Sequence, residues 1–111
     1  MSESTTLRLD GLAAPLRVLR LLAADFGHLP APNVQVSPIT PGELSLCFHD
    51  DLGAFEAWRD ALGVPGEAVS CREQSAGRTR VLKAAVDYGG AVVELVGFSD
   101  IPAAMVAGGV R

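Results

Sequence analysis

The residues that could do chemistry are few, and their sharpest cluster is the run His49-Asp50-Asp51. An imidazole beside two carboxylates can hold a divalent metal ion or share a proton, and His28, the other histidine, could join them. A metal site needs several converging ligands, however, and this run stands where a strand pattern gives way to a helix pattern. Because aspartate at a helix start accepts hydrogen bonds from free backbone N–H groups, we expect a helix cap, with no metal and no cofactor.

The two cysteines give a second possible site. Cys47 precedes His49 by two residues, so both side chains should fall on one face of a strand. Such neighbours are about 6.5–7 Å apart at Cα, which is loose for the Cys–His contact of a nucleophilic pair. Cys71 belongs to a different strand pattern, and no Cys-x-x-Cys motif occurs. We therefore expect buried, reduced thiols, assign no catalytic residue, and do not predict an enzyme.

Positive charge is concentrated in residues 71–83. This segment holds a single acid, Glu73, and four basic residues, Arg72, Arg78, Arg80 and Lys83. A basic β-ribbon can enter a major groove or follow a phosphate backbone. The whole chain has a formal net charge of −4, however, which repels nucleic acid at a distance. Nucleic-acid binding by this hairpin is therefore an alternative and not the leading hypothesis.

Apolar residues at three- and four-residue spacing predict two amphipathic helices. The first helix covers about residues 12–26 and stops at Gly27. Its inward stripe, which Val18 and Leu22 widen, consists of Leu12, Leu16, Leu19, Ala23 and Phe26. The second follows Asp50 and Asp51, ends at Gly63, and carries inward Leu52, Phe55, Trp58 and Leu62. We expect Trp58 to be a core anchor whose indole N–H finds a partner at the rim.

Alternating apolar and polar residues predict the strands. An antiparallel hairpin is expected from 34–37 and 44–49, and three further strands from 67–74, 78–88 and 91–98. Gly89-Gly90 is typical of a tight hairpin turn that pairs Tyr88 with Ala91. That register gathers one apolar face, Leu82, Ala84, Val86, Val93 and Leu95, and one mixed face, Lys83, Ala85, Asp87, Val92, Glu94 and Val96.

These elements predict an α+β fold with both helices on one face of a mostly antiparallel sheet of five or six strands, in the order (β)αββαβββ. If Thr6–Leu9 forms a strand, the first six elements have the ferredoxin-like order βαββαβ, extended by a terminal hairpin. The length of 111 residues fits one domain, 1–111, with 1–5 and 103–111 loosely ordered. With no apolar run of about 18 residues and no standard signal peptide, we expect a cytoplasmic protein without a membrane span.

Two segments carry a resemblance. LPAP at residues 29–32, followed by ELSLCFHDDLGAFEAWRDALG at residues 43–63, resembles a group of small proteins from high-GC actinobacterial genomes and their phages. The dominance of arginine over lysine, with Lys83 the only lysine, fits a GC-rich genome. The resemblance implies a bacterial or phage origin, and it brings no activity, cofactor or site residue with it.

The leading functional hypothesis follows from how the two helices would cover the sheet. Two helices cannot cover both faces of a five-stranded sheet, so the second face is solvated or meets a partner. We expect a non-enzymatic interaction or accessory module, acting as a homodimer or on a larger protein, with these interface residues: Val92, Val96, Phe98 and Ile101. The alternatives are a nucleic-acid-binding regulator that uses Arg72, Arg78, Arg80 and Lys83, and a small-ligand binder or enzyme at His49, Asp50 and Asp51.

Overall fold

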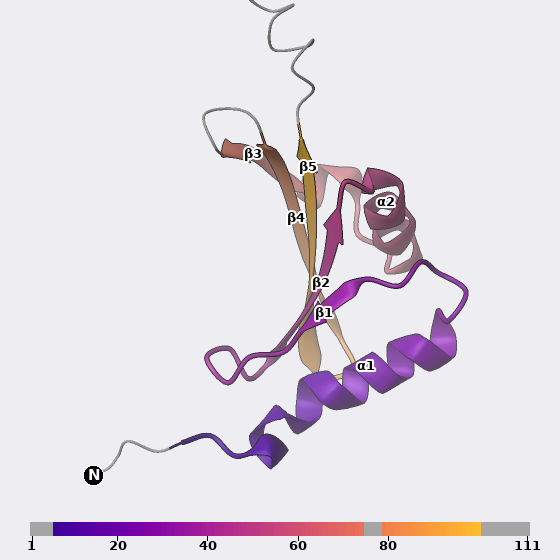
Figure 1. Cartoon of the computed structure of the whole chain (residues 1–111). Helices are drawn as coiled ribbons and strands as arrows, with labels where there is room; N and C mark the ends of the chain where they lie inside the picture. The colour runs from indigo at the N-terminus through magenta and orange to yellow at the C-terminus, as the bar shows by residue number, and fades with distance from the viewer. Residues whose placement is uncertain (1–5, 75–78, 101–111) are drawn as a thin grey trace, which may run out of the picture.

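The structure, a computed structural model, describes residues 6–74 and 79–100 and has the predicted α+β architecture (Figure 1). Two short 3₁₀ helices, η1 (Leu9–Leu12) and η2 (Gly66–Ala68), accompany the main elements. In chain order these are α1 (Ala13–Asp25), β1 (Asn33–Gln35), β2 (Glu43–His49), α2 (Leu52–Ala61), β3 (Ser70–Gln74), β4 (Thr79–Tyr88) and β5 (Ala91–Asp100). No helix among these residues is long and apolar enough to cross a membrane.

The five strands form one sheet in the order β1-β2-β5-β4-β3. Only β2 and β5 pair in parallel, and the predicted β1–β2 and β4–β5 hairpins are both antiparallel. The predicted register is confirmed, since Tyr88 pairs with Ala91 and Ala84 pairs with Leu95. Gly89 and Gly90 have φ values of +61° and +97°, which explains why the turn needs glycine.

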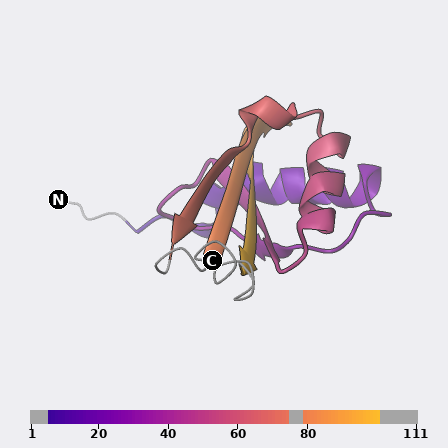
Figure 2. The same cartoon turned by 90° about the horizontal axis from the view of Figure 1, so that it is seen from above.

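Both helices lie on the same face of the sheet and contact β2 and β5 (Figures 1 and 2). Alternate strand residues meet them, and the resulting core contains Val18, Leu22, Leu44, Leu46, Phe48, Ala54, Phe55, Trp58, Val64, Ala84, Ala91, Val93 and Leu95. Trp58 is the predicted anchor: its side chain is buried, and its Nε1–H donates to the Pro30 carbonyl oxygen at 2.8 Å. The core therefore sits between one helix layer and one sheet face.

The predicted orientation of the first helix is partly wrong. The line that meets the sheet is Pro15, Val18 and Leu22, whereas Leu16 and Ala23 are exposed. Both sets have helical spacing, so the spacing alone does not choose between them. The helix is rolled toward its Val18–Leu22 side, and this leaves leucines on its outer surface.

Three predictions at the ends of elements are also corrected. Thr6–Leu9 does not form a strand, because Leu9 already begins η1, so the sheet of the described residues has five strands and not the six of the ferredoxin-like alternative. The strand predicted from residue 67 starts at Ser70, after η2. Cys71 therefore lies on a short edge strand and is exposed, contrary to expectation, whereas Cys47 is buried as expected. The predictions for 1–5, Ile101 and 103–111 fall outside the described residues.

Candidate functional site

The candidate site is the sheet face opposite α1 and α2, here called the open face. It carries a hollow of about 370 Å³ whose lining comes from all five strands: Gln35, Ser45, Cys47, His49, Arg72, Gln74, Val81, Lys83, Glu94, Val96 and Phe98. Along β2, β4 and β5 these residues alternate with core residues such as Leu46, Ala84 and Leu95. The open face is therefore a shallow concavity that spans the width of the sheet.

The floor of this hollow is apolar. Cys47, Val81 and Val96 are 6%, 1% and 5% exposed, and Phe98 packs against them. Val96 lies directly between Cys47 and Lys83 across the strands, so its neighbours cover it even though no helix does. Of the expected interface residues, Val96 is thus buried within one chain, whereas Val92 and Phe98 are half-buried.

The rim of the hollow is charged. Arg72 stands on β3, Lys83 on β4 and Glu94 on β5, where Ser45 Oγ donates to Glu94 Oε1 at 3.4 Å. The ion pairs found within residues 6–74 and 79–100 join other groups, so Arg72 and Lys83 have no acid at ion-pair distance among these residues. The rim therefore offers charges that a bound partner can pair.

Cys47 and His49 do share a strand face, as predicted, and both line the hollow. The His49 ring stacks on Phe98, with ring centroids 4.8 Å apart and planes 9° from parallel. Burial raises the pKa of the Cys47 thiol, the Glu94 carboxylate raises it further, and Lys83 opposes the shift. Because the thiolate is the reactive form of cysteine, this environment works against a nucleophile.

The side chains of His49, Asp50 and Asp51 make separate contacts with different parts of the fold. The Asp51 carboxylate accepts a hydrogen bond from the Ala54 N–H at 3.0 Å, which confirms the predicted helix cap. Asp50 has a φ of 56°, and its carboxylate accepts from the Asp100 N–H at 3.3 Å. Within the described ranges, no three His, Cys, Asp or Glu side chains gather as metal ligands.

The basic residues of the 71–83 hairpin do not form one patch in the structure. Arg72 and Lys83 lie on the open face. Arg80 alternates with Val81 along β4, so it points to the other side of the sheet, and Arg78 lies outside the described residues. A nucleic-acid backbone at the open face would therefore meet two of these cations and the acid Glu94.

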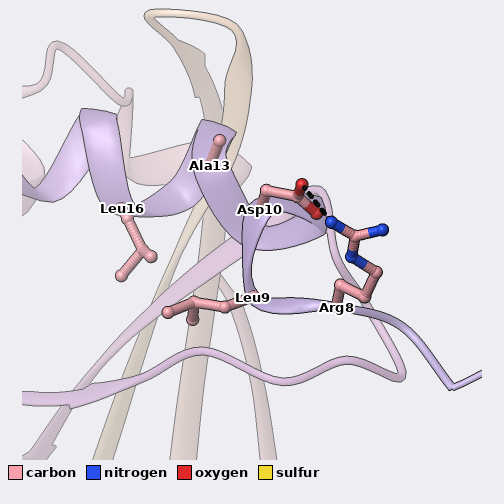
Figure 3. Close-up of a pocket in the computed structure, with 5 residues that line it drawn as sticks. All are labelled: Arg8, Leu9, Asp10, Ala13 and Leu16. Carbon is pink, nitrogen blue, oxygen red and sulfur yellow. Dashed lines mark ion pairs between the residues drawn. The ribbon is translucent and has the colours of Figure 1, made fainter.

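The outer surface of α1 is a second candidate that the sequence reasoning missed. Leu16 and Leu21 of α1 are 37% and 40% exposed, and Leu9 of the adjoining η1 is 73% exposed. Leu9, Ala13 and Leu16 line one hollow of about 490 Å³, beside an Arg8–Asp10 ion pair of 3.7 Å. Figure 3 draws these residues and the ion pair. The signal in the sequence was that this helix has more leucines than one buried stripe needs.

Comparison with protein-family models, with curated proteins and with solved structures finds no significant match for this chain. The function is therefore inferred from the chain's own residues.

Proposed function

We propose that the chain is a non-enzymatic protein-interaction module that binds its partner through the open face. The observation that carries this proposal is the layering: both helices contact the same face of the sheet, and the other face has a hollow with an apolar floor and a charged rim. An apolar centre inside a polar rim is the usual composition of a protein–protein interface.

The side chains that could catalyse a reaction favour this interpretation. Burial raises the pKa of the Cys47 thiol and so disfavours the reactive thiolate, and the His49 ring is stacked on Phe98. Asp50 and Asp51 each accept a backbone hydrogen bond at the start of α2 or the end of β5. These four residues therefore have structural roles that account for their positions.

A protein partner also fits the open face better than nucleic acid does. Glu94 pairs with Ser45 on β2 and with Ala85 on β4, and it places a negative charge inside the hollow. The Glu94 carboxylate would repel a phosphate backbone, whereas a protein can place a basic side chain against it. The mixed signs of the rim thus support a partner of mixed charge.

A photo-cross-linking side chain at Ala85 tests this proposal. Ala85 is exposed and pairs with Glu94 on the open face, so a probe there reaches the proposed partner without removing a contact of the hollow. Ala23, which is exposed on α1, is the matched control position. In the cells that make this protein, we expect specific adducts from position 85 and none from position 23. Adducts from position 23 alone, or from neither position, would contradict the proposal.

A further inference from the structure

The charges of the open face are arranged along one diagonal of the sheet. Arg72 pairs with Val81 on β4, and Lys83 stands two residues further along that strand. Lys83 in turn pairs with Val96 on β5, and Glu94 stands two residues away on that strand. One more such step leads to β2, where Glu43 pairs with Val92.

Each step along this line crosses one strand and moves two residues along it, so the four charged positions are about evenly spaced. All four side chains point to the same side, since each is an even number of residues from a residue that lines the hollow. The line reads positive, positive, negative, negative: Arg72, Lys83, Glu94, Glu43. Asp87, which pairs with Val92, adds a further acid at the negative end.

This pattern is its own complement when it is reversed. Two copies placed face to face about a two-fold axis perpendicular to the line bring Lys83 of each copy opposite Glu94 of the other. The same axis brings Arg72 of each copy opposite Glu43 of the other. A two-fold interface uses the same patch on both subunits, so every such contact occurs twice. We propose that the partner of the open face is a second copy of this chain, docked in this orientation.

The ion pairing of the neighbouring side chains supports a second copy of this chain as the partner. Lys83 and Arg72 have no acid at ion-pair distance among the described residues of their own chain, so both are available to the partner's carboxylates. The outer surface of α1 lacks this property, because Arg17 and Arg20 flank its leucines and a second copy would meet them with like charges. Of the two surfaces, the open face is the one that fits its own copy.

The floor of the hollow sets the expected strength of this dimer. Cys47, Val81 and Val96 are already buried within one chain, so docking removes little further apolar surface from water. The charged pairs then decide orientation more than affinity, and ionic strength should weaken them. We expect a reversible dimer that is favoured at low salt.

This inference rests on the proposed use of the open face, and charge reversal tests it. In Lys83→Glu the copies place Glu opposite Glu94 twice, and in Glu94→Lys they place Lys opposite Lys83 twice. Each variant alone should dimerise at least about tenfold more weakly than the parent chain in sedimentation equilibrium. An equimolar mixture of the two variants should restore the dimer, because every pair in the mixed dimer again joins opposite charges.

The mixture also controls for folding, since a chain that had lost its structure could not be rescued by the other. The double variant Lys83→Glu/Glu94→Lys should dimerise like the parent. A parent chain that stays monomeric at low salt, single variants that dimerise as the parent does, or a mixture that fails to recover would each overturn the inference. If the adduct from position 85 contains another protein instead of a second copy, the proposed function stands and this inference falls.

Discussion

The two faces of the central strands, β2 and β5, differ in what they bury and in the charges they carry. Along β2, the residues that meet the helices are Leu44, Leu46 and Phe48, all buried in the main core. The residues between them, Ser45, Cys47 and His49, line the hollow of the open face. One strand thus supports the core with every second side chain and presents a polar-rimmed surface with the rest.

The difference separates stability from interaction. The helix-covered face buries large side chains such as Phe55, Leu22 and Leu95 completely, and each contributes about 1.5–3 kcal/mol through burial. The open face buries smaller side chains in its own cluster, Cys47, Val81 and Val96, and surrounds them with charges. Substitutions on the first face should therefore lower stability more, and those on the second should mainly affect binding.

A pair of phenylalanine truncations should show the largest difference between the faces. Phe55 is fully buried and meets the Phe48 ring edge to face, with centroids 6.3 Å apart. Phe55→Ala should lower the free energy of unfolding by about 3–5 kcal/mol, because it leaves a cavity that α2 and the sheet cannot close. Phe98 is half-buried on the open face, and Phe98→Ala should cost about 1–2 kcal/mol.

Urea denaturation of both variants measures this difference, with a constant denaturant slope as the check that unfolding remains two-state. Equal losses of unfolding free energy in Phe55→Ala and Phe98→Ala would contradict this prediction. They would mean that side chains on the open face stabilise the fold as much as those on the helix-covered face do.

Adding volume, instead of removing it, should give a smaller contrast. Gly97 on β5 lies beneath α2, where a Cβ atom would come within 3.1 Å of the Phe55 ring and 3.2 Å of Leu52. Gly97→Val should therefore lower the free energy of unfolding by about 1–3 kcal/mol through overpacking. Ala85→Val on the exposed open face is the matched control and should change it by less than about 0.5 kcal/mol. A neutral Gly97→Val would show that α2 can move away from the sheet at little cost.

Much of this contrast could be predicted from the sequence, because its strongest signals are local. The Gly89-Gly90 turn set the register of β4 and β5, and this register separated the apolar face from the face of Lys83 and Glu94. Asp51 was a sound predictor of a helix start, since its carboxylate needs only the next turn of backbone as its partner. The composition of each face followed from these two local rules.

What the sequence did not show depends on contacts between distant segments. The roll of α1, which exposes Leu16, is set by how the helix meets the sheet, and two apolar stripes on one helix leave it undecided. The burial of Val96 depends on Cys47, forty-nine positions earlier, pairing with it in parallel. The diagonal of charges likewise requires the order β2-β5-β4-β3, which no pairwise pattern in the sequence contains.

Substitutions of the two cysteines should have the smallest effects on stability. The rates at which their thiols react should give the finest distinction between the exposed edge strand and the open face. Cys71 is exposed on the edge strand β3, whereas Cys47 lies in the floor of the open face with its pKa raised by burial. A disulfide reagent added to the folded chain should modify Cys71 at least about tenfold faster than Cys47, and a denaturant should equalise the two rates. Mass spectrometry of Cys47→Ala and Cys71→Ala assigns each rate to its residue.

The same burial predicts how stability depends on pH. Because the folded chain holds the Cys47 proton more tightly than the unfolded chain does, the unfolded state loses that proton first as pH rises. The contribution of this thiol to stability is therefore present below the ordinary thiol pKa and is lost as pH rises above it. Cys47→Ala should remove this part of the alkaline decline, and Cys71→Ala should leave it in place. If the stability of both variants declines with rising pH as that of the parent chain does, water reaches the floor of the open face more than its burial implies. The contrast between the two faces would then rest on the covered face alone.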